Sequence, residues 1–197
     1  MLGQRLLRVF YRRGPLFLHH SAAKALAEAG PRLVADIGSA NALLARALED
    51  HGYLPSYYLA LDVDSLLLAA APSRAWIERI QASAERLPLR GRAVDMAVLH
   101  DALHHFHRPW EALAEAARAA ECILIDDIDA GRLSGKLVEL AERLLGFPAR
   151  FARPSEVAEK LQENMMRVVM MEADQGLPTY RMLACRAAAP GSSRARP

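Results

Sequence analysis

Apolar and polar positions follow two alternating patterns along most of the chain. Short apolar runs of strand length recur, and most are followed by a segment with the spacing of an amphipathic helix. The first such pair is the run LVADIG at 33–38, followed by the helical pattern ANALLARALEDHG. Strands that alternate with helices are typical of a parallel sheet with helices on both faces. The pattern therefore predicts an α/β fold.

The same alternation continues through the centre of the chain. Further strand signals are at 57–64, at the end of the segment 76–84, at 94–99 and at 122–129. We interpret the three aspartates at the end of the run 122–129 as loop formers; they are Asp126, Asp127 and Asp129. Ahead of the first strand, Ser21 is the expected N-cap of a helix over 22–29. We therefore expect five parallel strands.

The C-terminal part breaks this alternation. A helix capped by Ser155 is followed by apolar runs at 167–174 and 179–187, which are joined by only four residues, QGLP. Because so short a connection can only reverse the chain, these two strands must be antiparallel. The prediction is a doubly wound, Rossmann-like seven-stranded sheet with five parallel strands and a C-terminal antiparallel hairpin. Residues 188–197 lack an apolar pattern and are expected to be a flexible tail.

Composition is that of an ordinary globular domain, which we place over residues 1–187. The 197 residues are 52% hydrophobic and 24% charged, and no apolar run reaches the ~18 residues of a membrane span. Cys122 and Cys185 match no metal-ligand spacing, so we expect buried free thiols in a reducing, cytoplasmic compartment.

Positive charge is concentrated near the start of the chain. Residues 1–32 contain six Lys or Arg residues and one Glu, whereas the whole chain has a formal charge of +2. We expect residues 1–20 to form a basic cap helix with a solvated face, although an anionic partner such as RNA is an alternative. Residues 129–155 are expected to form a partial lid.

Polar residues gather where the predicted strands end. In an open parallel sheet, the ligand binds beyond the carboxyl ends of the strands, where the strand order reverses. The first strand ends in Asp36 and Gly38, the second in Asp62, and the fourth in His100 and Asp101. The later glycines of a dinucleotide fingerprint are missing after Gly38. Since Asp36 would repel a pyrophosphate but attract an ammonium or sulfonium group, the site favours a cationic nucleoside over NAD.

Three segments, in this order, resemble the class I S-adenosylmethionine-dependent methyltransferases, especially the branch of the quinone and menaquinone biosynthesis methylases. VADIGSANALLARAL is similar to the first motif of the family and YYLALDVD to the second. QASAERLPLRGRAVDMAVLHDALHHF is similar to the run that holds an adenine-contacting loop, a Leu-Pro pair and a Leu-His-His close. The resemblance implies S-adenosylmethionine as the cofactor and in-line methyl transfer to a small-molecule acceptor.

The resemblance also assigns cofactor contacts to particular positions. Asp62 would accept hydrogen bonds from both ribose hydroxyls, Gly38 would let the backbone approach the methionine part, and Val63 would pack on adenine. Asp36 would favour the amino group, and His100 would line the methionine side. The full expected set is Asp36, Gly38, Ser39, Asp62, Val63, Ser83, Ala84 and His100.

The candidate catalytic residues are those nearest the expected reaction point: Asp101, His104 and His105. Alignment supplies most of the catalysis of methyl transfer, and a base helps where the acceptor is a phenol or a similar acid. Together with His100 and His107, the same residues could bind a metal. Because the Leu-His-His run already has a family explanation, we expect no metal.

Three positions depart from the family pattern. Ala40 and Ala42 replace glycines, and a left-handed backbone at either would cost about 1–2 kcal/mol. Ser83 stands where an acidic residue is usual, so the adenine amine lacks a charged partner. These departures leave open the alternative of a catalytically inactive binding or regulatory module. The basic N-terminus leaves open a second alternative, an RNA methyltransferase.

Overall fold

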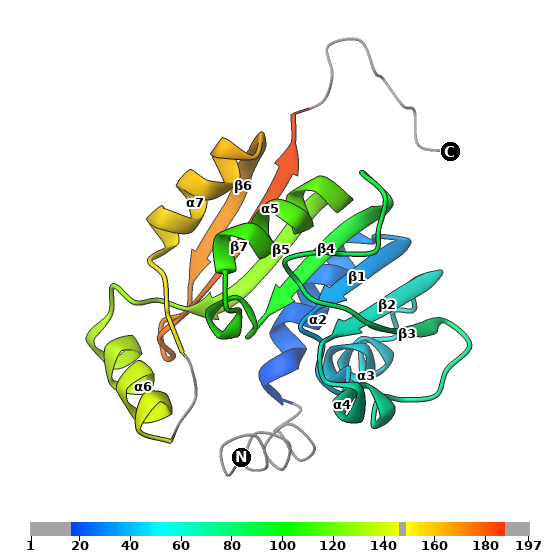
Figure 1. Ribbon diagram of the computed structural model, residues 1–197, viewed down its shortest axis with the longest axis horizontal. Helices are drawn as coiled ribbons and strands as arrows, with labels where there is room; N and C mark the ends of the chain where they lie inside the picture. Colours follow the sequence, from blue (N-terminus) through cyan, green and yellow to red (C-terminus); the bar gives the residue numbers. More distant parts are fainter. Residues whose placement is uncertain (1–16, 146–148, 188–197) are drawn as a thin grey trace.

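The computed structural model describes residues 17–145 and 149–187, which form a seven-stranded sheet covered by helices (Figure 1). The strand order is β3-β2-β1-β4-β5-β7-β6. The first five strands pair in parallel, and β7 is antiparallel to both β5 and β6. In chain order the strands are β1 (Leu33–Ile37), β2 (Tyr57–Asp62), β3 (Ile77–Gln81), β4 (Val94–His100), β5 (Ala120–Ile128), β6 (Met166–Ala173) and β7 (Thr179–Arg186). The predicted fold class is confirmed.

Seven helical segments connect or precede these strands in the described part of the chain. They are α2 (Phe17–Ala29), α3 (Leu43–Asp50), α4 (Ser65–Ala69), the 3-10 helix η1 (Leu103–His105), α5 (Pro109–Ala119), α6 (Leu133–Leu144) and α7 (Pro154–Glu163). None of these described helices is long and apolar enough to cross a bilayer. Residues 1–16 of the predicted cap helix and the predicted tail lie outside the described residues.

Two predicted helix caps are wrong. Ser21 lies inside α2, and its hydroxyl accepts a hydrogen bond from Arg181 at 2.6 Å. Ser155 lies in the first turn of α7, which begins at Pro154 after the N-cap Arg153. Proline is favoured at the first helical position because its fixed φ is close to the helical value. The N–H that proline lacks would make no hydrogen bond within the helix at this position.

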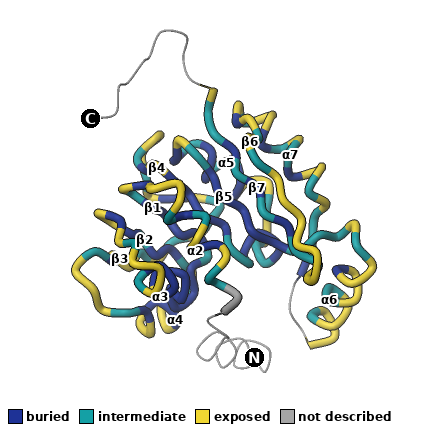
Figure 2. The backbone as a smooth tube through the Cα atoms, turned by 180° about the vertical axis from the view of Figure 1, so that it is seen from behind, coloured by how far each residue is buried: buried dark blue, intermediate teal, exposed yellow. Residues whose placement is uncertain are grey.

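The alternation of side chains along each strand divides the core into two layers. In β1, Val34 belongs to the layer of α2, α3 and α4, whereas Ala35 belongs to the layer of α5 and α7. Figure 1 shows α5 in front of the sheet and α2 behind it, and Figure 2 shows that the buried residues follow the central strands. Helix α6 lies beyond the carboxyl end of β5, apart from the sheet (Figure 1). Packing on both faces therefore holds the ends of β1, β2 and β4 in fixed positions.

The strand order reverses at β1, which pairs with β2 on one side and β4 on the other. The connections after β1 and β4 leave the sheet on opposite sides of this point. Such a switch point leaves a crevice at the carboxyl ends of the strands.

Cys122 and Cys185 form a disulfide, so the expectation of free thiols is wrong. The register of β5 and β7 places the two residues opposite each other, with their Cα atoms 4.1 Å apart. This pairing exists because β7 inserts between β5 and β6. The cysteines therefore give no support to a reducing compartment.

Candidate functional site

A cavity of about 420 Å³ lies at the carboxyl ends of β1, β2 and β4, beside the switch point. Its walls are the turn after β1, the end of β2, and the segments that follow β3 and β4. Small-molecule sites in proteins have volumes of about 300–1,000 Å³. The predicted site residues in its wall are Gly38, Asp62, Val63, Ser83, Ala84, Asp101 and His105.

Two backbone amides hold the carboxylate of Asp62 at the end of β2. Its Oδ2 accepts a hydrogen bond from the Ala40 amide at 2.8 Å, and its Oδ1 accepts one from the Asp64 amide at 2.8 Å. One amide on each oxygen leaves both oxygens with further acceptor capacity. Burial raises the pKa of Asp62 above its usual value despite these hydrogen bonds. Asp64 has another role, since its side chain caps α4.

The turn after β1 packs closely against the segment after β4. Gly38 has a φ of +77°, and a Cβ at this position would lie 2.9 Å from the Cβ of Ala102 and 3.1 Å from the ring of Phe106. A side chain larger than that of glycine therefore does not fit. Ala40 (φ 48°) and Ala42 (φ 53°) are both left-handed, so the strain foreseen from the sequence is present at both positions.

Three predicted cofactor residues do not line the cavity: Asp36, Ser39 and His100. Asp36 is 3% exposed and accepts a hydrogen bond from the Tyr58 hydroxyl. Burial raises the pKa of Asp36 to about 7, although the hydrogen bond from Tyr58 opposes this shift. His100 packs against the ring of His19 from α2, with centroids 4.7 Å apart.

Glu85 is a cavity residue that the sequence reasoning missed. Its carboxylate accepts a hydrogen bond from the Ser83 hydroxyl, and both residues line the cavity. Burial alone would raise the pKa of Glu85. Hydrogen bonds to its carboxylate, of which that from Ser83 has the largest effect, outweigh burial and lower this pKa below its usual value. Ser83 therefore does have a negatively charged neighbour. In the sequence, Glu85 stands two positions after Ser83, the position at which the family pattern has its acidic residue.

Helix η1 carries two of the predicted catalytic residues. The Nδ1 of His104 lies 2.5 Å from Oδ1 of Asp127, and its Nε2 lies 3.9 Å from Oδ1 of Asp101. Burial lowers the pKa of His104, but nearby carboxylates, above all Asp127, raise it to about 9. Burial and the neighbouring His104 lower the pKa of His105 to about 3. The interpretation of Asp127 as a loop former is wrong, since it is a buried residue of β5.

A second cavity, of about 390 Å³, adjoins the first, and His107 contributes to both walls. His104 and Asp127 line this second cavity, together with the aromatic side chains of Trp110, Phe151 and Tyr180. Asp101 and His105 line the first cavity. The three candidate catalytic residues therefore lie along the boundary between the two cavities.

One family model matches the segment that carries most of the first cavity. Residues 35–121, which span β1 to the start of β5, match the family model described as a methyltransferase domain. The matched segment is less than half of the chain, and it agrees with the resemblance to the class I S-adenosylmethionine-dependent methyltransferases. No curated protein sequence matches the chain.

Solved methyltransferase structures share the fold. An S-adenosylmethionine-dependent methyltransferase of Thermotoga maritima has a TM-score of 0.73 at 17% identity, with 93% of this chain and 95% of that chain covered. The magnesium protoporphyrin IX methyltransferase of Synechocystis PCC 6803, with bound SAH, has a TM-score of 0.69 at 15% identity, covering 87% and 83%. A Haloferax volcanii methyltransferase in complex with the Trm112 activator has a TM-score of 0.72 at 15% identity, covering 88% and 90%. At these identities the likeness shows the fold alone.

The first cavity suits S-adenosylmethionine, the cofactor that the match to a methyltransferase domain implies. The described residues that line it include four carboxylates and no Lys or Arg, which favours a ligand with ammonium and sulfonium charges. Val63 is 71% exposed beside Asp62 and offers an apolar surface for a flat base. The residues present therefore fit this cofactor.

Proposed function

We propose that this protein transfers the methyl group of S-adenosylmethionine to a small-molecule acceptor. The observation that carries the proposal is the charge of the first cavity. Its four carboxylates belong to Asp62, Asp64, Glu85 and Asp101, and no Lys or Arg lies among its described lining residues. Such a wall attracts a sulfonium cofactor and repels pyrophosphate and triphosphate groups.

The ribose, the adenine and the cationic groups of the cofactor each have a proposed partner in this wall. Asp62 binds the ribose hydroxyls, and each charge-assisted hydrogen bond contributes about 1.5–3 kcal/mol. Val63 packs on the adenine ring, and the Ser83–Glu85 pair receives its exocyclic amine. Asp101 lies on the wall after β4, toward the methionine part.

The second cavity is the proposed acceptor site. Its aromatic walls and volume of about 390 Å³ suit a small, flat acceptor. When bound, S-adenosylmethionine supplies an electrophilic methyl group. The protein's contribution is to hold the acceptor in line with it, and such alignment can supply about 7–11 kcal/mol of the barrier. Asp101, His104 and His105 lie where the acceptor atom would enter from the second cavity.

One of the two grounds for the inactive module, the missing acidic residue at Ser83, loses its support. Glu85 provides the carboxylate that Ser83 lacks, whereas the left-handed strain at Ala40 and Ala42, the other ground for this alternative, is present. The basic residues on which the RNA alternative depends lie mostly within residues 1–16, outside the described chain.

The proposal is tested by measuring S-adenosylhomocysteine formation by mass spectrometry. The full chain is incubated with S-adenosylmethionine and either a panel of small phenols, amines and carboxylic acids or total RNA, and a sample without acceptor is the control. We expect product formation with at least one small-molecule class. Cofactor binding without turnover would support the inactive module, and turnover with RNA alone would refute the acceptor class. If calorimetry shows no binding of millimolar S-adenosylhomocysteine, the whole proposal is wrong.

A further inference from the structure

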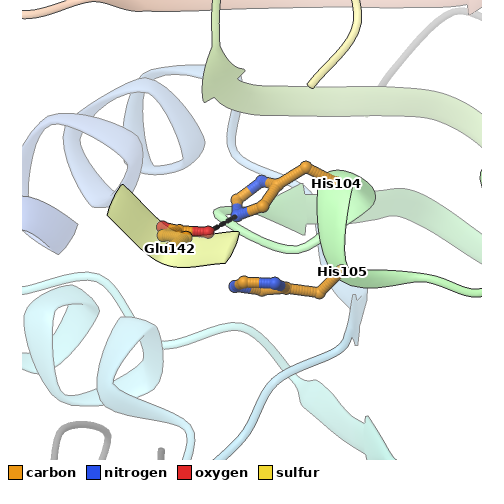
Figure 3. Close-up of side chains that lie close together, drawn as sticks. All are labelled: His104, His105 and Glu142. Atoms are coloured by element: carbon orange, nitrogen blue, oxygen red, sulfur yellow. Dashed lines mark ion pairs between the residues drawn. The ribbon is translucent and has the colours of Figure 1, made fainter. Parts of the chain in front are cut away.

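A histidine pair and a glutamate from a distant helix lie close together (Figure 3). His105 lines the first cavity and His104 the second. His104 and His105 are consecutive in η1, and Glu142 comes from α6. One potential ligand atom from each residue lies within 4.8 Å of the other two. His104 Nε2 and Glu142 Oε2 are 3.9 Å apart, too far for a hydrogen bond. Ligand atoms of a tetrahedral metal site are about 3.4 Å apart, given bonds of about 2.0–2.1 Å, so a small inward movement suffices.

Two of these ligand atoms are buried without a hydrogen-bond partner. His104 Nε2 and Glu142 Oε2 make no hydrogen bond within the described structure, and the His104 side chain is only 1% exposed. Buried polar atoms in native proteins nearly always have a partner, because leaving them unsatisfied is costly. A single bound cation would satisfy both atoms.

The other ring nitrogen of His104 is held in the way that is typical of a metal-bound histidine. Its Nδ1 lies 2.5 Å from Oδ1 of Asp127. Asp127 in turn accepts backbone hydrogen bonds from Ile128 at 2.7 Å and from His104 at 3.3 Å. A carboxylate on one imidazole nitrogen fixes the ring and directs the lone pair of the other nitrogen toward a metal.

The charges around His104 also favour a cation. Asp127 contacts one ring nitrogen, and Asp101 and Glu142 each lie 3.9 Å from the other. Three carboxylates thus surround one imidazole, which can carry at most one positive charge. A divalent ion would neutralise this excess.

We propose that His104, His105 and Glu142 bind a divalent transition-metal ion. Two imidazole nitrogens and one carboxylate oxygen suit Zn²⁺, Fe²⁺ or Co²⁺ better than Mg²⁺ or Ca²⁺. Three protein ligands leave a position for water or for an oxygen of the acceptor, since the ion would lie between the two cavities. The site departs from the sequence expectation of no metal, and it does not depend on the cofactor assignment.

The test is titration of ZnCl₂ into the full chain by calorimetry after treatment with EDTA, with Co²⁺ absorption as a second readout. The main variant is Glu142→Gln, because Glu142 is partly exposed and its replacement should not disturb folding. The matched control is Glu139→Gln, which removes a carboxylate of the same helix that pairs with Arg143 at 2.6 Å. We expect one Zn²⁺ per chain, at least tenfold weaker binding by Glu142→Gln, and no change for Glu139→Gln. No binding by the wild type, or equal binding by wild type and Glu142→Gln, would overturn the site.

Asp127→Asn tests the positioning of His104 and should weaken Zn²⁺ binding about 10–100-fold. Its thermal melt shows whether the variant is folded. Titration of the same samples with S-adenosylhomocysteine separates the two proposals, since Glu142 does not line the first cavity and Glu142→Gln should bind it as the wild type does. Zn²⁺ binding without S-adenosylhomocysteine binding would support the metal site and refute the proposed function. The reverse result would refute the metal site alone.

Discussion

The carboxylate of Asp62 accepts a hydrogen bond from the backbone amide of Ala40 at 2.8 Å. This contact joins the end of β2 to the turn after β1, two segments that are far apart in the sequence. It also ties the proposed ribose-binding residue to a left-handed alanine, with a φ of 48°. The shape of the turn and the position of the carboxylate therefore depend on each other.

Replacing Ala40 with glycine should relieve strain. Relief of about 1–2 kcal/mol of left-handed strain exceeds the entropic cost of glycine, about 0.5–1 kcal/mol. Ala40→Gly should therefore leave the free energy of unfolding in urea unchanged or raise it by up to about 1.5 kcal/mol. Ala45→Gly, inside α3, is the control and should lower it by about 1 kcal/mol. An equal loss in both variants would show that the left-handed turn is not strained.

Gly38→Ala should destabilise the protein more than Gly52→Ala does. Both glycines have positive φ, so both substitutions introduce left-handed strain. At Gly38 the new methyl group also meets Ala102 and Phe106, whereas Gly52 has open space around it. The overpacking should add about 1–3 kcal/mol at Gly38, measured as the difference between the two unfolding free energies. Similar losses would mean that the turn does not pack against the segment after β4.

The stability of the wild type should fall between about pH 4 and pH 7 relative to that of Asp36→Asn. Burial raises the pKa of Asp36 from 3.8 to about 7, so the folded chain binds more protons than the unfolded chain between these values. Stability is then lost as the pH rises through this range, by up to about 1.4 kcal/mol per pH unit. Asparagine does not titrate and can still accept the hydrogen bond from Tyr58. Urea unfolding at several pH values measures the difference, and parallel curves would contradict a buried, titrating Asp36.

Reduction of the disulfide should lower the melting temperature. Cys122 and Cys185 are 63 residues apart in the sequence, and a cross-link of this kind stabilises the folded state by about 2–4 kcal/mol. Thermal melts with and without a reductant measure the shift, and the variant with both cysteines changed to alanine should show none. Two reactive thiols in the unreduced, denatured wild type would exclude the disulfide.

The local pattern of the sequence predicted most of the fold and part of the wall of the first cavity. Asp62, Val63 and Gly38 were found because they stand at fixed positions relative to strand ends, and parallel strands bring those ends together. The contact of Asp127 with His104 and the proposed role of Glu142 could not be predicted, because each depends on which distant side chain the residue faces, and no local pattern shows this. The Cys122–Cys185 pairing was missed for the same reason, since it depends on the insertion of β7 beside β5.

The most direct test of Asp62 as the ribose-binding carboxylate is calorimetric titration with S-adenosylhomocysteine. The wild type is compared with Asp62→Ala and with Asp64→Asn, which retains the cap of α4 because asparagine is as good an N-cap as aspartate. We predict that Asp62→Ala binds at least tenfold more weakly, since each lost hydrogen bond contributes about 1.5–3 kcal/mol, and that Asp64→Asn binds nearly as well as the wild type. Equal affinity of the wild type and a folded Asp62→Ala would contradict the assignment of this cavity to the cofactor.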